Sequence, residues 1–236
     1  MIELRGLKKK FGRLTVLDEP DLEIPSGQAT GIVGPNGSGK TTMIKSILGL
    51  VKPTEGEVLI NGELVNDRWE YREKIGYMPQ VARYPENMTV EELFTFIKKI
   101  RGNKSSYELK LIDHFALEPE LKKPMRTLSG GTRQKVGAVL SMMFDPEILI
   151  FDEPTAGLDP RSSVQFKKKV QNLKERGKTI ILTTHIMSEI EELADYLIFI
   201  VEGKIKYHGP MKELLAHHKA QRLEGAVAKM MEEEAA

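Results

Sequence analysis

Cysteine is absent from all 236 residues, which excludes disulfide bonds, thiol catalysis and thiolate metal sites. Long apolar runs are also missing. The longest, residues 197–201, is far too short to cross a bilayer, and the first five residues form no apolar signal segment. The formal net charge of +1 gives no broad attraction to nucleic acid or acidic lipid. We therefore expect a cytoplasmic protein without a nucleic-acid partner, which reaches a membrane only through another protein.

The composition that is present favours a globular fold. Hydrophobic residues make up 40% of the chain and charged residues 29%. The length suffices for one large α/β domain or two small ones.

The most informative segment is a glycine-rich loop at residues 34–41. Two glycines flank four residues and are followed by lysine and a hydroxyl, which is the P-loop pattern for holding nucleotide phosphates. Glycines let backbone N–H groups point inward toward an anion, and the start of the next helix favours negative charge. Lys40 is expected to bind the outer phosphates, and the Thr41 hydroxyl to bind Mg²⁺. Residues 29–33 and 43–48 have the patterns of a buried strand before the loop and an amphipathic helix after it.

The chain has a strand-rich core interrupted by a helical insert. Short β-type runs fill residues 1–80, helical periodicity covers about 89–145, and buried strands return at 148–151 and 179–183 around a helix over 161–176. Thr89 and Glu92 form the pattern of a capping box. We expect core segments at 1–80 and 146–216, an insert at 81–145, and a polar tail at 217–236. The tail is expected to be a solvated or frayed helix, with both of its histidines exposed.

Four polar residues follow predicted strands and suit phosphate chemistry. Asp152 ends an apolar strand and is placed to bind Mg²⁺, and Glu153 follows with no apparent need as a salt-bridge partner, as expected of a general base. Gln80 ends a strand where the insert begins and could contact both Mg²⁺ and the attacking water. His185 ends another strand and could hydrogen-bond the γ-phosphate. Each of the last two residues would be uninformative alone.

A second helix start is built for an anion. Ser129 with Gly130 and Gly131 opens a helix that continues beyond Val139. One chain thus carries two phosphate-binding helix starts but a single P-loop lysine. The simplest explanation is that the second start contacts the nucleotide held by another copy of the chain.

With these motifs the sequence resembles the nucleotide-binding subunits of ABC transporters over residues 2–215. The resemblance implies a P-loop NTPase (RecA-like) α/β core with an antiparallel β subdomain and an inserted α-helical subdomain, forming an ABC ATPase domain over residues 1–216. It implies ATP and Mg²⁺ as cofactors. The matching nucleotide-contacting positions are Phe11, Gly34, Pro35, Asn36, Gly37, Ser38, Gly39, Lys40, Thr41, Thr42, Ser129, Gly130, Gly131 and Asp159.

Within this family pattern Phe11 matches the aromatic residue that stacks on adenine, although by residue type alone it would be a core residue. The signature, residues 128–132, departs from the commonest LSGGQ form by having Thr132 in its fifth place. We expect ATP binding to survive, because Ser129 and Gly131 are intact.

The resemblance implies that two subunits pair head to tail around two ATP molecules. In that arrangement Glu153 activates water, His185 and Lys40 stabilise charge on the γ-phosphate, Gln80 contacts Mg²⁺, and Asp159 couples the two sites. Opening and closing of the dimer drives a separate polytopic membrane permease, against which residues 81–87 help to form the docking surface. The sequence of residues 75–87 and 128–135 looks like that of ABC-2 exporter subunits. Within that type it is most similar to the ATPases of the copper-processing systems of nitrous oxide reductase maturation.

Other classes are less compatible with the sequence. A GTPase needs an Asn-Lys-x-Asp guanine-binding motif, and residues 103–106 lack its aspartate and follow a helix. A chromosome ATPase needs long coiled coils or a second ATP domain. A soluble ATPase of iron–sulfur cluster assembly has the same motifs, and copurifying partners would distinguish it. A purely structural protein would not hydrolyse ATP.

Overall fold

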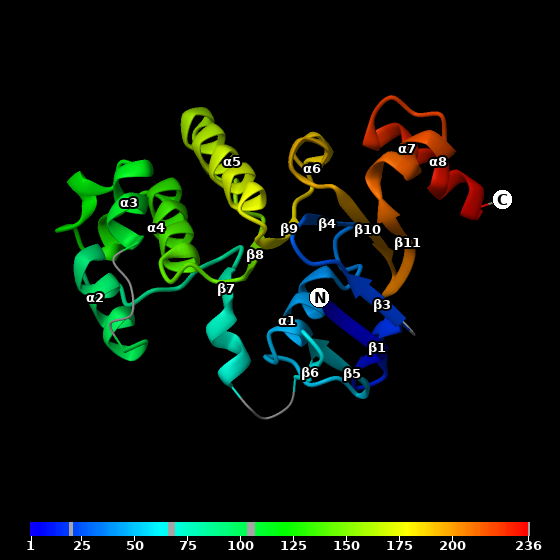
Figure 1. Cartoon of the computed structure of the whole chain (residues 1–236), viewed down its shortest axis with the longest axis horizontal. Coiled ribbons are helices and arrows are strands. Elements are labelled where there is room, and N and C mark those ends of the chain that lie inside the picture. The colour runs from blue at the N-terminus through cyan, green and yellow to red at the C-terminus, as the bar shows by residue number, and fades with distance from the viewer. Residues whose placement is uncertain (19–20, 66–68, 103–106, 236) are drawn as a thin grey trace.

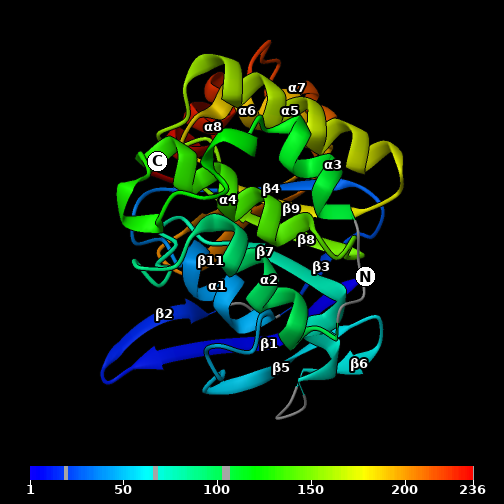
Figure 2. The same ribbon diagram turned by 90° about the vertical axis from the view of Figure 1, so that its left-hand side faces the viewer.

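A computed structural model describes residues 1–18, 21–65, 69–102 and 107–235. Two sheets and the helices around them form layers (Figure 1, Figure 2). The first sheet is antiparallel, with strand order β2-β1-β5-β6 and β3 paired with β1. Its strands are β1 (Ile2–Phe11), β2 (Leu14–Asp18), β3 (Asp21–Ile24), β5 (Glu55–Ile60) and β6 (Glu63–Leu64).

The second sheet carries the candidate site at the carboxyl ends of its parallel strands. Its order is β11-β10-β4-β9-β8-β7, and all neighbours are parallel except β11, which pairs antiparallel with β10. The strands are β4 (Ala29–Val33), β7 (Ile75–Met78), β8 (Ile148–Asp152), β9 (Thr179–Thr183), β10 (Tyr196–Val201) and β11 (Lys204–Pro210). β4, β8 and β9 are buried at every position, as expected of parallel strands covered on both faces.

The two faces of this sheet pack into different cores. On one face, Ile32 and Ile150 join residues of the antiparallel sheet and of α1 (Lys40–Ile47), so that α1 lies between the two sheets. On the other face, Leu149 and Phe151 pack against α4 (Gly130–Met142) and α5 (Pro160–Glu175). Phe151 meets Phe166 of α5 edge to face, with ring centroids 5.1 Å apart. Successive side chains of β8 point to opposite faces of the sheet, so this one strand contributes to the core on each side.

The helical insert contains α2 (Val90–Ile100), α3 (Tyr107–His114) and α4, with the short 3₁₀ helices η2 (Glu118–Glu120) and η3 (Met125–Thr127) between them; η1 (Glu70–Lys74) precedes β7. The predicted capping box is confirmed, because the Thr89 side chain accepts from the Glu92 N–H and the Glu92 side chain accepts from the Thr89 N–H. The apolar residues of these helices are not all buried. Ile100 and Leu109 are exposed, whereas Leu111 is fully buried.

The C-terminal segment differs from the prediction of a solvated tail. After α7 (Met211–His217), α8 (Leu223–Ala235) packs on α6 (Met187–Leu193) and α7. Leu223, Ala226, Val227 and Met230 are buried in the main core. Their spacing of three and four residues is helical, so α8 has one apolar face that α6 and α7 cover. His218, expected on the surface, is also buried.

None of the helices in the described part of the chain has the length and hydrophobicity that a transmembrane span requires.

Candidate functional site: a phosphate-binding loop and its partners

The P-loop joins β4 to α1 through backbone that requires glycine. Gly34 and Gly39 have φ values of +155° and +109°. A Cβ atom on Gly34 would lie 2.0 Å from the carbonyl oxygen of Ile200, and one on Gly39 would lie 2.8 Å from that of Val16. Neither position has space for a side chain, because β10 and β2 pack closely against the loop, and both positions therefore require glycine.

The loop presents groups that fit a phosphate. Lys40 is half-buried, and its Nζ donates to the carbonyl oxygens of Gly34 at 2.7 Å and Pro35 at 2.9 Å. Burial lowers the pKa of Lys40, while the nearby charges of Glu153 and Asp152 act in the opposite direction. Ser38 Oγ is buried and has no hydrogen-bond partner among the described residues, although a buried hydroxyl ordinarily has one.

The start of α1 also favours an anion. Its N-cap is Gly39, which has no side chain to accept from the first-turn N–H groups. Those groups have no partner within the helix, and they add to the positive end of the helix dipole. Together with the Ser38 hydroxyl, they make the loop fit the phosphates of ATP.

Asp152 lies at the end of β8 beside the loop. It is 5% exposed, and Thr183 Oγ1 of the neighbouring β9 donates to its Oδ1 at 2.5 Å. The two residues are paired in the register of the parallel strands. This hydrogen bond orients the carboxylate, which with the exposed Thr41 hydroxyl gives the oxygen donor set that suits Mg²⁺.

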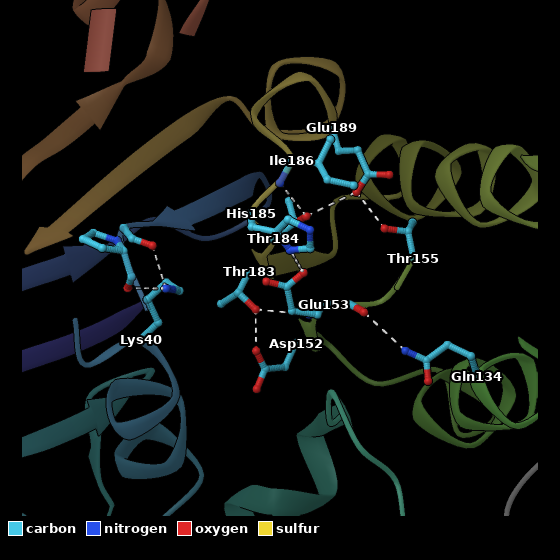
Figure 3. Close-up of polar contacts among 12 residues, drawn as sticks. Lys40, Gln134, Asp152, Glu153, Thr155, Thr183, Thr184, His185, Ile186 and Glu189 are labelled. Carbon is cyan, nitrogen blue, oxygen red and sulfur yellow. Dashed lines mark hydrogen bonds and ion pairs between the residues drawn. The ribbon is translucent and has the colours of Figure 1, made fainter. Parts of the chain in front are cut away.

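Glu153 has an unusual backbone and a side-chain partner. Its φ is +52°, a left-handed conformation that non-glycine residues rarely adopt. His185 Nδ1 lies 2.8 Å from Glu153 Oε2 (Figure 3), with the histidine side chain 71% exposed and the glutamate 12%. The sequence showed no need of a partner for Glu153, yet the structure gives it a hydrogen-bond partner in His185, because β8 and β9 end side by side and bring both predicted site residues into contact.

Other side chains hold this loop region in place. The N–H of Glu153 donates to the carbonyl oxygen of Thr183 at 3.0 Å and to its Oγ1 at 3.2 Å, and Gln134 Nε2 donates to the Glu153 carbonyl oxygen at 3.2 Å. Glu189 Oε2 accepts from Thr155 Oγ1 at 2.7 Å and from Thr184 Oγ1 at 3.4 Å. The carboxylate of Glu189 thus joins the segment after Glu153 to the residue before His185.

Sequence reasoning missed Gln134, Thr155, Thr183, Thr184 and Glu189 as residues of the site. The signal available for the threonines was their position beside Asp152, Glu153 and His185. Gln134 and Glu189 lie on helices and carry no local signal of this kind.

Ser129 is the N-cap of α4, as predicted. Its Oγ accepts from the Thr132 N–H at 3.1 Å and shares a second hydrogen bond with Thr132 Oγ1 at 2.9 Å. Ser129 and Gly130 are exposed. A Cβ on Gly131 would lie 2.9 Å from the carbonyl oxygen of Gly157, so the start of α4 packs tightly against the segment that follows Glu153.

Asp159 caps α5. Its side chain accepts from the N–H of Ser162 at 3.0 Å and from the Ser162 hydroxyl, and these hydrogen bonds hold the pKa of Asp159 below its usual value. In the single chain it therefore orders the turn after Gly157.

Phe11 and Gln80 lie on other edges of the region. Phe11 ends β1 and is 51% exposed, so the core alternative for it is wrong. Lys9 Nζ lies 4.8 Å from the centroid of its ring. Gln80 is exposed two residues beyond β7, whose last residue, Met78, pairs with Phe151 of β8. Gln80 therefore lies at the same sheet edge as Asp152 and Glu153.

The structure thus divides the predicted residues between two surfaces. The P-loop, Asp152, Glu153 and His185 share the sheet edge, whereas Ser129, Gly130 and Gly131 begin α4. In Figure 3, Lys40 and Gln134 lie on opposite sides of Glu153, and Ser129 precedes Gln134 at the start of the same helix.

The chain is similar to known proteins over most of its length. Residues 17–156 match the family model described as ABC transporter. The lantibiotic transport ATP-binding protein SrtF of Streptococcus pyogenes is 34% identical over 207 residues, covering 87% of this chain and 89% of that protein. The Nod factor export ATP-binding protein I of Ralstonia nicotianae is 34% identical over 92% of this chain and 69% of its own length.

Solved structures give the same result for the fold. An ATP-binding subunit of an ABC transporter superposes with a TM-score of 0.90 at 27% identity, covering 98% of this chain and 99% of that one. A dimeric ATP-binding cassette in a post-hydrolysis state, bound to ADP and Pi, superposes with a TM-score of 0.80 at 30% identity, covering 89% and 99%. The predicted P-loop NTPase fold is confirmed. The chain therefore belongs to the ABC transporter family and is an ATPase cassette of that family.

Proposed function

We propose that the chain binds MgATP and hydrolyses it as a head-to-tail dimer that drives export through a separate membrane permease. The observation that carries the proposal is the separation of two anion-binding helix starts in one chain. Lys40 at the start of α1 lies near Asp152 and Glu153. The exposed Ser129 begins α4, whose Gln134 lies on the other side of Glu153 from Lys40 (Figure 3). A second copy, turned head to tail, supplies the missing half of each site, and a dimeric ATP-binding cassette occurs among its structural relatives.

The P-loop half of the site holds the nucleotide. Lys40, the Ser38 hydroxyl and the first-turn N–H groups of α1 bind the phosphates. Thr41, Asp152 and Gln80 hold Mg²⁺, which, when bound, neutralises charge on the phosphates. Phe11 stacks on adenine through the ring face that Lys9 leaves uncovered.

Glu153 acts as the general base. Its carboxylate accepts a proton from water as the water oxygen bonds to the γ-phosphorus and the bond to the β–γ bridging oxygen breaks. His185 lies 2.8 Å from this carboxylate, so it orients Glu153 and then stabilises the γ-phosphate oxygens. Lys40 also stabilises the negative charge that develops on the γ-phosphate oxygens, from the side opposite His185.

The insert supplies the permease contact. A groove of about 860 Å³ lies between the start of α2 and the residues before it, and the exposed Phe96 forms part of its wall. It is lined by Pro85, Glu86, Asn87, Met88, Glu91, Glu92, Thr95, Phe96 and Lys99. An apolar ring among charged groups fits an amphipathic loop of a polytopic permease. In a cell the cassette would then lie in the cytoplasm against the inner face of the membrane, and a permease should copurify with it.

The proposed domain has core segments 1–80 and 146–216 around an insert at 81–145, and the C-terminal segment joins the core through α8. The names of the relatives refer to lantibiotic and Nod factor transport, so we propose export. The finer assignment, to copper processing in nitrous oxide reductase maturation, remains a prediction from the sequence resemblance.

The substitution Glu153→Gln tests the proposed chemistry. It keeps the shape of the side chain and removes the base, so hydrolysis should fall by at least about a hundredfold while ATP binding persists. ATP should then trap a dimer that size-exclusion chromatography resolves. Glu175→Gln, the same change on the exposed end of α5, is the matched control. Hydrolysis at the wild-type rate by the Glu153→Gln protein would refute the assignment of the base.

A further inference from the structure

Gln134 connects α4 to the catalytic glutamate of the same chain. It lies five residues after Ser129, the residue is 8% exposed, and its Nε2 donates to the carbonyl oxygen of Glu153 at 3.2 Å (Figure 3). A buried amide with this geometry joins two segments that are 19 residues apart in sequence. Nothing in the phosphate chemistry assigned above uses it.

The backbone that Gln134 holds is strained. At φ +52°, Glu153 adopts a conformation that costs a non-glycine residue free energy and persists only where the surroundings impose it. The N–H of Glu153 is held by both Thr183 oxygens, and its carbonyl group is held by Gln134. Because the direction of a side chain follows its backbone, these hydrogen bonds set where the Glu153 carboxylate points.

A second contact links the same two segments. Gly131 approaches Gly157 so closely that a Cβ would lie 2.9 Å from the Gly157 carbonyl oxygen. The start of α4 therefore contacts the chain at and just beyond Glu153 in two places. α4 is a continuous helix from Gly130 to Met142, so Ser129, Gly131 and Gln134 move together.

We propose that Gln134 is a positioning residue that couples the two ATP sites of the dimer. This inference rests on the proposed head-to-tail arrangement, in which Ser129 contacts the nucleotide of the partner subunit while Glu153 acts on the nucleotide of its own chain. When Ser129 engages the partner's γ-phosphate, α4 shifts and Gln134 brings Glu153 into line with the attacking water. Each site then reaches full activity only when the other one is engaged.

The substitution Gln134→Met tests the hydrogen bond while keeping the size of the side chain. We expect kcat to fall by about tenfold, since a small misplacement of a catalytic group is costly, while ATP affinity of the monomer is unchanged. The Hill coefficient for ATP should fall from above one in the wild type to one. Gln171→Met, at a half-buried position on α5, is the matched control. Wild-type kcat and Hill coefficient in the Gln134→Met protein, or an equal loss of monomer affinity, would overturn the proposal.

Mixed dimers test the coupling without changing Gln134. One chain carries Ser129→Arg and the other Glu153→Gln, and two affinity tags isolate the mixed species. Only one of its sites has both an intact Glu153 and an intact Ser129 opposite it. Independent sites would give half the wild-type rate per dimer. Our proposal expects about a tenth or less, because the active Glu153 is linked through its own Gln134 to a signature that cannot engage.

The outcomes separate this inference from the proposed function. A wild-type protein that neither dimerises with ATP nor hydrolyses it refutes the proposed function. An active wild-type dimer whose mixed form retains half the rate supports the proposed function and refutes the coupling role of Gln134.

Discussion

The two helix starts that are expected to meet ATP are stabilised in opposite ways. α1 begins at Gly39, which provides no side-chain cap, and the Ser38 hydroxyl beside it has no partner among the described residues. α4 begins at Ser129, whose hydroxyl accepts from the Thr132 N–H and pairs with the Thr132 hydroxyl. The start of α1 leaves its N–H groups and the Ser38 hydroxyl available to a ligand. At the start of α4, a side-chain cap already takes up one N–H group and the Ser129 hydroxyl.

In the proposed dimer, this difference explains why one start would bind nucleotide alone and the other would need a partner. At α1, the loop is held in shape by backbone contacts, such as the hydrogen bond from the Gly203 N–H to the Ser38 carbonyl oxygen, and not by capping. An anion at α4 competes with an existing cap, so binding there is weak unless the anion arrives already fixed. A phosphate held by the P-loop of a second copy meets that condition.

Removing Lys40 should have the largest effect of the substitutions that distinguish the two helix starts. Lys40→Ala removes the cation that is proposed to face the outer phosphates, so hydrolysis should fall by about a hundredfold to a thousandfold and monomer affinity for ATP should fall with it. Steady-state rates and calorimetric titration of the monomer measure the two effects. Lys45→Ala, on an exposed turn of the same helix, should change neither. Intact monomer affinity in the Lys40→Ala protein would contradict the assignment of the P-loop as the half that binds alone.

Blocking the second start should separate binding from hydrolysis. Ser129→Arg places a large cation where the partner's phosphate should enter, so hydrolysis should fall by about a hundredfold. Monomer affinity for ATP should stay unchanged, as measured by the same titration. The milder Ser129→Ala removes the cap of α4 and should lower the free energy of unfolding by about 1 kcal/mol in chemical denaturation. Equal loss of affinity and rate with Ser129→Arg would mean that α4 acts on the nucleotide of its own chain.

The aromatic contact belongs only to the first half of the comparison. Phe11→Ala removes a stacking surface, so monomer affinity for ATP should fall by about tenfold, while the rate at saturating ATP should change little. Leu14→Ala is the matched control, because Leu14 pairs with Phe11 across the hairpin and is 66% exposed. A loss of rate at saturation with unchanged affinity would show that Phe11 does not contact the base.

Much of the fold follows from local sequence signals. Continuous apolar runs predicted strands at 148–151 and 179–183, and the structure has β8 at Ile148–Asp152 and β9 at Thr179–Thr183. Their register places Asp152 opposite Thr183, so both Glu153 and His185 had to lie at one sheet edge. The location of the candidate site was therefore predictable, because parallel strands share an edge.

The connections within the site were not predictable. The pairing of Glu153 with His185 depends on a left-handed backbone at Glu153, which a residue type other than glycine does not signal. The hydrogen bonds made by Gln134 and Glu189 span segments 19 and 34 residues apart, and only tertiary packing sets them. The burial of α8 was missed for a similar reason, because its few apolar residues become a core face only against α6 and α7.

The smallest expected effect concerns the hydrogen bond between the Ser129 and Thr132 hydroxyls within the signature. Thr132 stands where the commonest family pattern has glutamine, and its hydroxyl lies 2.9 Å from Ser129 Oγ. Thr132→Val deletes that hydrogen bond but keeps the backbone cap, so the free energy of unfolding should fall by less than about 1 kcal/mol. Hydrolysis should stay within about twofold of wild type, because the Ser129 hydroxyl is freed without losing its place. Chemical denaturation and steady-state rates measure both values. Loss of activity as large as that of Ser129→Arg would show that the Thr132 hydroxyl itself contacts the partner's nucleotide, and the fifth signature position would then be part of the anion-binding start.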